Sequence, residues 1–263
     1  MDMLAEPGLI PAQRRKRIRE LITSQGSVRV STLSELLKVS EITIRRDLDR
    51  LEEEGILERT HGGAIYSHHM RVEPLYTEKD RIHREEKREI GRAAAALVED
   101  GDTLLINSGS TTLHIFRHLA GRKDLQVITS NMGALLETQG VGLALIFIGG
   151  TYREQSNSLV GPLGMLSLGR VSANKCFIGV DGISRKYGLT TPILREAEIA
   201  RAMIERTHGQ VVAVADHSKL GVVADFVTAS VAEVDILVVD DGFDEEYRSE
   251  LEGLGLEIII ASA

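Results

Sequence analysis

The sequence has no tryptophan, few aromatic residues (4%) and a single cysteine. One cysteine excludes an intrachain disulfide and a zinc site built on several thiolates. No run of apolar residues approaches the roughly 20 that a membrane-spanning helix needs. The chain also does not open with a basic start followed by an apolar core. We therefore expect a cytoplasmic protein that does not associate with membranes, and we expect Cys176, within an apolar run, to be a small buried hydrophobe.

The net charge of −8 is unusual for a nucleic-acid-binding protein, but it is unevenly distributed. Residues 1–60 contain 11 Lys/Arg and 11 Asp/Glu, whereas residues 61–263 contain 20 and 28 and account for the whole excess. Residues 13–50 carry 10 basic and 5 acidic side chains, a local charge of +5. Because charges beyond about 8–10 Å are screened, an acidic body is compatible with a basic head that binds DNA.

The pattern of the first 66 residues predicts three helices and a hairpin. Apolar residues recur at helical spacing over residues 13–24, and a second helix is expected to start near Ser31. A short strand is expected over residues 27–30. Residues 56–66 contain two β-prone segments joined by a His61-Gly62-Gly63 turn, which is typical of a hairpin.

The third helix, predicted over residues 41–54, is the most informative element. Ser40 is a good N-cap for it. Ile44, Leu48 and Leu51 stand at i, i+4 and i+7, so they are expected to face the core. The opposite side then presents its arginines and one isoleucine to the outside, which is the arrangement of a DNA recognition helix.

Several side chains on that outer side suit contacts with base edges. An exposed Ile42 suits a thymine methyl group, and Arg45 or Arg46 suits bidentate pairing with O6 and N7 of guanine. Ser40 or Thr43 suits a bond to a base or a phosphate. The pattern by itself leaves open whether the basic face binds DNA or is only solvated.

Phosphate contacts are expected from the first helix and from the hairpin. The segment 14–19 contains five basic side chains, Arg14 and Arg15 among them, and phosphate contacts add affinity without sequence information. Arg59 and His61 place further donors on the hairpin. The residues predicted to bind DNA are Ser40, Glu41, Ile42, Thr43, Arg45, Arg46, Arg50, Arg15, Arg59 and His61.

Three segments of this region together resemble the DeoR family of bacterial transcription regulators. They are VSEITIRRDL at residues 39–48, LEEEG at residues 51–55 and RTHGGA at residues 59–64. The resemblance extends over essentially the whole chain from about residue 12. It implies a winged helix-turn-helix ahead of a sensor domain, with double-stranded operator DNA as a partner.

Beyond residue 80 the pattern changes to short apolar runs that alternate with helical segments. A charged helix is expected first, over about residues 79–98. The runs expected to be strands are 103–106, 127–129, 143–148, 176–180, 211–215, 236–239 and 257–260, with helices at 112–119, 195–206 and 245–254. Near-continuous apolar strands that alternate with helices are typical of a parallel sheet covered on both faces. The sequence therefore predicts an α/β domain with a mostly parallel sheet.

Five of the apolar runs end in small or polar residues, and the carboxyl ends of parallel strands form the usual binding crevice. A Gly/Ser/Thr turn before a helix suits a phosphate group, although a single turn of this kind is often only an N-cap. Lys219 suits an anion, and Asp181, Glu196 and Asp216 suit sugar hydroxyls. The residues predicted to bind an effector are Ser108, Gly109, Ser110, Thr111, Thr112, Ser130, Asn131, Gly150, Asp181, Gly182, Glu196, Asp216 and Lys219.

The family resemblance adds expectations for this domain. It implies the ribose-phosphate isomerase and CoA-transferase fold, and a phosphorylated sugar or related metabolite as effector. The segments that match the family pattern are SGSTT at 108–112, TSN at 129–131, DG at 181–182 and ADHSK at 215–219, with Glu196 as its glutamate. Asn107 departs from the pattern, because many members have an aspartate there, and this puts the choice of ligand in doubt.

The predicted organisation is an N-terminal arm (1–12), a winged helix-turn-helix domain (13–66), a linker (67–80) and an effector-sensing α/β domain (81–263). Because helix-turn-helix proteins usually read two half-sites as dimers, we expect a homo-oligomer, either a dimer or a tetramer. The predicted function is a transcription regulator, expected to be a repressor, whose operator binding responds to the effector. No catalytic residue, cofactor or metal is predicted.

Two alternatives stay open at this point. The first is a sugar-phosphate isomerase-like enzyme with a DNA-binding head, because Asp181, Glu196 and Lys219 could serve as acids and bases. The second is a protein that binds DNA without sequence preference, which an exposed Ile42 among base-facing residues disfavours. A metal site is poorly supported, since His114 and His118 at i, i+4 are more simply explained as a structural pair.

Overall fold

The computed structural model describes residues 9–25, 27–66, 68–69, 73–242 and 245–262. The chain divides into two compact units, Met1–His69 with Asp244–Glu250 and Met70–Phe243 with Leu251–Ala263. Residues 1–8 of the predicted arm lie outside the described residues. Pro11 and Ala12, which were also assigned to the arm, instead open the first helix. Proline is favoured at that position because the first helical N–H has no partner within the helix.

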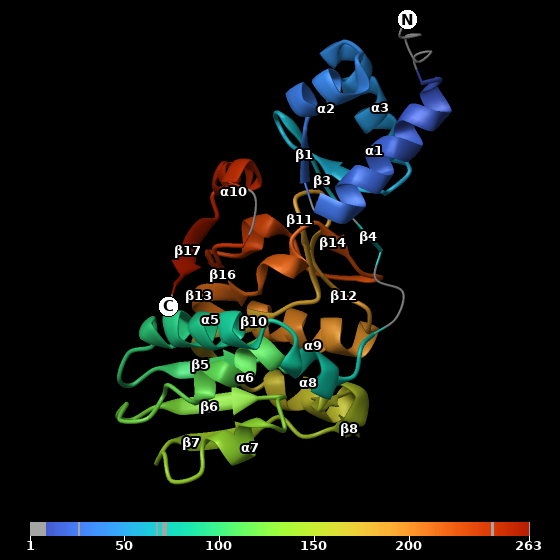
Figure 1. Ribbon diagram of the computed structural model, residues 1–263. Coiled ribbons are helices and arrows are strands. Elements are labelled where there is room, and N and C mark those ends of the chain that lie inside the picture. The colour runs from blue at the N-terminus through green and yellow to red at the C-terminus, as the bar shows by residue number, and fades with distance from the viewer. Residues whose placement is uncertain (1–8, 26, 67, 70–72, 243–244, 263) are drawn as a thin grey trace, which may run out of the picture. The chain divides into compact units, whose positions relative to one another are not determined.

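Within its Met1–His69 part, the described residues of the first unit form three helices and a small antiparallel sheet (Figure 1). Its elements are α1 (Pro11–Gln25), β1 (Ser27–Arg29), α2 (Val30–Leu37), α3 (Glu41–Glu53), β2 (Leu57–Arg59), β3 (Gly63–Tyr66) and the short β4 (His68–His69). Strand β3 lies between β1 and β2 and pairs antiparallel with both. This order confirms the predicted winged helix-turn-helix, in which β2 and β3 form the wing.

The core of this unit confirms the predicted inward side of α3. Ile44 and Leu48 are 0% exposed and pack with Ile18 and Ile22 of α1. The Oγ of Ser40 accepts a hydrogen bond from the backbone N–H of Thr43 at 3.3 Å, as an N-cap does. The amphipathic pattern of α3 therefore decides which of its sides is available to a ligand.

A glycine sets the close approach of the wing to β1. A Cβ atom at Gly63 would lie 2.0 Å from the carbonyl oxygen of Val28, which no real side chain permits. Val28 pairs with Ala64 in the β1–β3 ladder, directly beside this contact. The glycine in the predicted turn is thus required by packing rather than by an unusual φ angle.

The second unit is built on a seven-stranded sheet in which every neighbouring pair is parallel. The strand order is β17-β16-β13-β10-β5-β6-β7. The strands are β5 (Thr103–Ile106), β6 (Gln126–Thr129), β7 (Ala144–Phe147), β10 (Ala173–Gly179), β13 (Thr207–Val214), β16 (Ile236–Asp240) and β17 (Glu257–Ala261). All seven apolar runs expected to be strands are therefore confirmed, to within a few residues at their ends.

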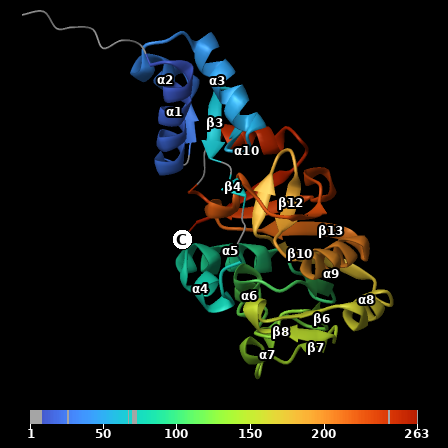
Figure 2. The ribbon, with the colours of Figure 1, turned by 90° about the vertical axis from the view of Figure 1, so that its right-hand side faces the viewer.

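Helices cover both faces of this sheet, and Figure 2 shows α5 and α6 on one side of it and α9 on the other. The helices of the chain beyond residue 80 are α5 (Arg84–Ala96), α6 (Ser110–Phe116), α7 (Ala134–Glu137), α8 (Pro162–Leu168), α9 (Leu194–Glu205) and α10 (Glu245–Glu252). Phe177 belongs to the core under α5 and α6, while its neighbours Cys176 and Ile178, also 0% exposed, point the other way. Burial of both faces explains the near-continuous apolar strands. Among the described residues, no helix has the length and apolarity required to cross a membrane.

Shorter elements, which the sequence pattern did not predict, complete the second unit. They are β8 (Thr151–Arg153), η1 (Glu154–Ser156), β9 (Ser158–Val160), β11 (Gly182–Ser184), β12 (Gly188–Thr191), η2 (His217–Lys219), β14 (Val222–Val223), β15 (Phe226–Ala229) and η3 (Val231–Glu233). Strands of two to four residues are too short to show a clear alternation of apolar and polar residues. Several of them border the site described below.

The prediction of a single helix over residues 79–98 is wrong in one respect, because the structure has two helices in this region. Helix α4 (Tyr76–Arg81) starts inside the predicted linker and stops before His83, whose φ of +52° lies in the left-handed region. Helix α5 then begins at Arg84. The pattern of charged residues does not predict this break between the helices. The break is stabilised by Lys87, which is buried and donates hydrogen bonds to the carbonyl oxygens of Lys79 and Ile82.

Candidate functional site

The outer side of α3 presents a polar and basic surface with one large apolar side chain. Ile42 is 65% exposed, and Arg45, Arg46 and Arg50 are exposed with it. Arg45 lies 3.7 Å from Glu41, and Arg50 forms an ion pair with Glu53 at 2.8 Å. Arg46 forms no ion pair with any residue that the structure describes. Of the three arginines on this surface, Arg46 is therefore the one that needs to break no salt bridge before it pairs with an anion or a base.

One basic residue of α1 is placed differently from the prediction. Arg14, expected to contact phosphates, is 8% exposed, and its guanidinium forms an ion pair with Asp47 of α3, which is 4% exposed. Arg14 also donates a hydrogen bond to the carbonyl oxygen of Leu9 at 3.2 Å. Arg15 lies 3.7 Å from Asp47 and is half-buried. Arg14 therefore joins two helices of the core, and its charge is neutralised inside the unit.

The wing residue Arg59 also has partners within the unit. Its Nε donates to the carbonyl oxygen of Gly63 at 3.1 Å, and its Nη1 donates to that of Arg45 at 3.1 Å. The same guanidinium pairs with Asp49. Arg59 thus braces the wing against α3, whereas the side chain of the neighbouring His61 is exposed.

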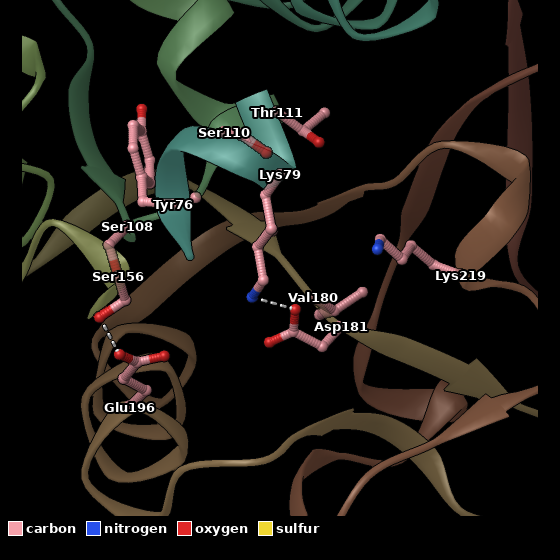
Figure 3. Close-up of a pocket in the computed structure, with 12 residues that line it drawn as sticks. Tyr76, Lys79, Ser108, Ser110, Thr111, Ser156, Val180, Asp181, Glu196 and Lys219 are labelled. Carbon is pink, nitrogen blue, oxygen red and sulfur yellow. Dashed lines mark hydrogen bonds and ion pairs between the residues drawn. The ribbon is translucent and has the colours of Figure 1, made fainter. Parts of the chain in front are cut away.

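A second candidate site is a pocket at the carboxyl edge of the parallel sheet (Figure 3). Strands β5 and β10 are neighbours, but the chain leaves β5 toward β6 and leaves β10 toward β13, so the strand order reverses between them. Ligands of open α/β sheets bind at such a reversal. The residues that line the pocket are Tyr76, Lys79, Ser108, Gly109, Ser110, Thr111, Ser156, Gly179, Val180, Asp181, Glu196 and Lys219.

The Ser108–Thr111 turn of this pocket is held from behind by buried amides and hydroxyls. The backbone N–H of Ser108 donates to Ser130 Oγ at 2.9 Å, and Asn131 Nδ2 donates to the carbonyl oxygen of Gly109 at 3.1 Å. Ser130 and Asn131 are 1% and 0% exposed. They position the turn, whose Ser108, Ser110 and Thr111 line the pocket.

Asn107, the residue that departs from the family pattern, joins the two strands beside the pocket. Its Nδ2 donates to the carbonyl oxygen of Gly179 at 2.9 Å, and its Oδ1 accepts from the N–H of Gly179 at 2.8 Å. An ionised carboxylate could only accept, so an asparagine is the better match for this pair of contacts. Asn107 is buried and does not line the pocket.

Two carboxylates face the pocket in different surroundings. Asp181 Oδ2 accepts a hydrogen bond from Thr191 Oγ1 at 3.0 Å. Asp181 Oδ1 forms an ion pair with Lys79 Nζ at 2.6 Å. Glu196 accepts a hydrogen bond from Ser156 Oγ and lies 3.1 Å from Nη1 of Arg153. Burial raises the pKa of Glu196 above its usual value, against the opposing effects of Ser156 and Arg153.

Lysines approach the pocket from two sides. Lys219, in η2 after β13, lines it and forms no ion pair within the part of the chain that the structure describes. Lys79 comes from α4 and points at Asp181 in Figure 3. Asp216 lies behind Lys219, 1% exposed, where it accepts hydrogen bonds from the backbone and hydroxyl of Ser218.

The structure brings seven of the thirteen predicted effector residues together around the pocket: Ser108, Gly109, Ser110, Thr111, Asp181, Glu196 and Lys219. It places the other six behind or beside it: Thr112, Ser130, Asn131, Gly150, Gly182 and Asp216. Thr112, for example, is 0% exposed, and its hydroxyl donates to the carbonyl oxygen of Asn107 at 2.9 Å. The pattern of polar strand ends thus identified the right edge of the sheet but did not separate lining residues from supporting ones.

Five lining residues were not predicted: Tyr76, Lys79, Ser156, Gly179 and Val180. Gly179 and Val180 directly precede Asp181, so they were within reach of the strand-end argument. Tyr76 and Lys79 lie in the segment interpreted as a linker, and Ser156 in a stretch without periodicity. No signal in the sequence pointed to these three, because they reach the pocket only through tertiary packing.

A helix-turn-helix head and an α/β unit with a polar pocket at its strand ends define a DNA-binding regulator with a sensor domain. Residues 14–70 match the model of the DeoR-like helix-turn-helix domain, and residues 82–241 match that of the DeoR C-terminal sensor domain. The chain therefore belongs to the DeoR family of transcription regulators.

Full-length relatives support this membership. The HTH-type transcriptional regulator GlpR of Haloferax volcanii is 32% identical over 95% of this chain and 98% of that protein. The transcriptional repressor AccR of Agrobacterium fabrum is 32% identical over 95% of this chain and 97% of its own. Among solved structures, a ribose 5-phosphate isomerase from Methanocaldococcus jannaschii aligns with 52% of this chain and 55% of its own, at 17% identity and a TM-score of 0.39.

Proposed function

We propose that this protein is a sequence-specific repressor whose binding to an operator is modulated by a phosphorylated sugar or a chemically related metabolite. The pocket between β5 and β10 is the effector site, and the outer side of α3 reads the DNA. The protein acts as a dimer or tetramer, since each chain has one recognition helix and operators of this class of protein contain repeated half-sites. The observation that carries the proposal is the chemistry of the pocket: it is lined by Lys219, which forms no ion pair with any residue that the structure describes, and by the carboxylates of Asp181 and Glu196.

The two sides of the pocket suit the two ends of a sugar phosphate. Lys219 and the hydroxyls of Ser108, Ser110 and Thr111 suit the phosphate oxygens, which accept charge-assisted hydrogen bonds. Asp181 and Glu196 suit the hydroxyls of the sugar, which donate to carboxylate oxygens. A ligand with both ends would therefore engage both sets of polar groups that line the pocket.

A thermal-shift screen tests the effector class. Purified protein is heated with glucose 6-phosphate, fructose 1-phosphate, ribose 5-phosphate and glycerol 3-phosphate, each paired with its unphosphorylated counterpart. We expect at least one phosphorylated compound to raise the unfolding temperature, because a ligand that binds only the folded state stabilises it. Lys219→Ala should weaken that ligand about tenfold or more, while Lys123→Ala, at an exposed lysine away from the pocket, should not. A screen in which no phosphorylated compound outperforms its counterpart contradicts the proposal.

The DNA-reading side is tested separately. A preferred duplex is selected from a random-sequence library with the wild-type protein, and affinities are then measured for Arg46→Ala and for Arg122→Ala as a charge-matched control. Loss of a base contact by Arg46 should cost about 1–3 kcal/mol on the selected duplex and less on a scrambled one. Equal losses for the two variants would show that Arg46 contributes only charge.

A further inference from the structure

Residues 73–79, which include the first four residues of helix α4, contribute two charged side chains beside the pocket, Glu73 and Lys79. Lys79 Nζ lies 2.6 Å from Asp181 Oδ1, and the two side chains are only 16% and 12% exposed. Lys79 is also 3.9 Å from Glu73, whose side chain is 5% exposed. The carboxylate that suits a ligand hydroxyl is therefore already occupied by an ammonium group from the segment that precedes the sensor sheet.

A second tie joins the same segment to the other pocket carboxylate. The guanidinium of Arg153 pairs with Glu73 on one side and lies 3.1 Å from Glu196 on the other. Gln155 Nε2 donates to the backbone carbonyl of Glu73 at 2.9 Å. Both pocket acids are thus connected, directly or through one arginine, to residues 73–79.

The far end of α4 is fixed in a different way. The buried ammonium of Lys87 donates to the carbonyl oxygen of Ile82 at 2.6 Å and to that of Lys79, and it lies 3.7 Å from Asp216. Lys87 belongs to α5, whose Ile90 and Ala94 are 0% exposed in the core. Between the two helices the chain turns at His83. The backbone from Lys79 to Ile82 is therefore anchored by Lys87, whereas the side chains of Lys79 and Glu73 are held by Asp181 and Arg153.

The contact of α4 with α6 is incompletely satisfied. Within the described part of the chain, five buried side-chain polar atoms have no hydrogen-bond partner, and three of them are Tyr76 Oη, Asp80 Oδ1 and His114 Nε2. Tyr76 and Asp80 lie on α4, and His114 lies on α6. Burial lowers the pKa of His114 to about 4, so its ring is neutral and does not form an ion pair with Asp80. Because buried polar atoms without partners cost free energy, this contact resists a displacement of α4 less than a fully bonded one.

We propose that Lys79 is a tethered competitor of the effector: a ligand that reaches Asp181 displaces the ammonium of Lys79 and weakens the attachment of residues 73–79 to the pocket. The proposal rests on the proposed function of the pocket. Displacement at α4 reaches the head through chain connectivity, since only four Cα–Cα steps of about 3.8 Å separate Glu73 from His69.

Lys79→Met tests this role, because methionine keeps a long apolar side chain and removes the charge. The matched control is Arg81→Met, which removes a cation from an exposed position of the same helix. Two quantities are measured with the full-length protein: affinity for the sugar phosphate with the largest thermal shift in the screen above, and affinity for the selected DNA duplex without ligand. Unfolding temperatures are recorded for each variant, and Lys79→Gln is used if Lys79→Met unfolds.

We expect Lys79→Met to bind the sugar phosphate about tenfold more tightly, the effect of removing one competing charge-assisted hydrogen bond. Without ligand, its DNA affinity should shift in the direction that the ligand produces in the wild type, within the range of about 5–150-fold typical of coupled sites. Asp181→Asn breaks the same tie from the other side, so it should shift DNA affinity similarly while weakening the sugar phosphate. Arg81→Met should change neither quantity.

Two results would overturn the proposal. A loss of sugar-phosphate affinity in Lys79→Met as large as in Lys219→Ala would make Lys79 a ligand-binding cation instead of a competitor. DNA affinity equal to that of the wild type in both Lys79→Met and Asp181→Asn would show that the tie is not coupled to the head. If the wild type binds no phosphorylated sugar, the proposed effector class fails, but the DNA measurement without ligand still decides whether the tie matters.

Discussion

Asp47 and Arg14 form a buried ion pair although they lie 33 positions apart in the sequence. Both belong to segments that the sequence predicts to be basic and exposed. Neither charge is available to DNA. A buried pair of this kind often adds little net stability, because both groups lose hydration, but one charge without the other is strongly unfavourable. Their contribution is therefore to the relative placement of α1 and α3.

Asp47→Ala is expected to destabilise the helix-turn-helix unit by about 3–5 kcal/mol, because it leaves the guanidinium of Arg14 buried without its carboxylate. Asp49→Ala is the control, since Asp49 also pairs with an arginine but is 61% exposed. Urea unfolding followed by circular dichroism measures both. Similar losses for the two variants would contradict the structural role of Asp47.

Asn107 offers a second test at the level of one side chain. Asn107→Asp replaces the donor to the carbonyl oxygen of Gly179 by a carboxylate oxygen, so two acceptors face each other in a buried site. We expect a loss of about 1–3 kcal/mol at pH 7. The loss should shrink near pH 4, where a protonated carboxyl group donates again. Thermal unfolding at both pH values measures it, and a loss independent of pH would mean that the amide is not the donor.

At the scale of elements, the crossing of α5 and α6 positions the Ser108–Thr111 turn. A Cβ atom at Gly91 of α5 would lie 2.4 Å from Cβ of His114 and 2.7 Å from its carbonyl carbon, so the two helices touch through a glycine. The amino end of α6 carries Ser110 and Thr111 into the pocket. Any side chain at Gly91 must therefore push the helix that bears part of the candidate site.

Gly91→Ala is expected to lower the stability of the sensor unit by at least about 1–3 kcal/mol, the cost of overpacking a close contact. It should also weaken the sugar phosphate, because α6 must shift. Ala96→Ser, on the exposed side of the same helix, is the control and should be nearly neutral. Differential scanning fluorimetry with and without ligand measures both effects. An unchanged unfolding temperature in Gly91→Ala would contradict the close helix contact.

At the scale of the whole molecule, stability depends on pH through a pair that joins two strand ends. His217 Nδ1 lies 2.6 Å from Asp240 Oδ2, and this hydrogen bond raises the pKa of His217 above 6.5. Burial opposes ionisation of Asp240, but the hydrogen bonds from His217 outweigh it and lower the pKa of Asp240 below 3.8. The contribution of His217 is present in full below pH 6.5 and fades as the pH rises through its raised pKa. That of Asp240 is present above pH 3.8 and fades as the pH falls through its lowered pKa.

Asp240→Asn should therefore cost more stability at about pH 6 than at about pH 9, by roughly 1 kcal/mol, because only the charged pair is sensitive to pH. The backbone bonds that Asp240 accepts from His217 and Gly242 remain possible for an asparagine oxygen at either pH. Denaturant unfolding at the two pH values gives the difference. A cost that is equal at both would show that the ionised pair contributes nothing.

Periodicity and strand-end chemistry in the sequence determined most of the architecture. The inward side of α3, the exposure of Ile42 and the seven parallel strands follow from the spacing of apolar residues. Burial is a property of each residue's position along a helix or strand, and it repeats with a period that a single chain displays. The edge of the sheet that bears the pocket could be predicted for another reason: polar residues follow five of the apolar runs, and the carboxyl ends of parallel strands lie at one edge.

Only the tertiary structure decided which polar groups meet. Lys79 reaches Asp181 across 102 positions, Arg153 joins Glu73 to Glu196, and Asp47 is buried although its neighbour Arg46 is exposed. Such contacts depend on the path of the chain between distant elements and leave no period in the sequence. From the sequence alone, a lysine in a polar stretch without periodicity is predicted to be solvated. Only the packing of distant elements shows that a carboxylate lies beside it.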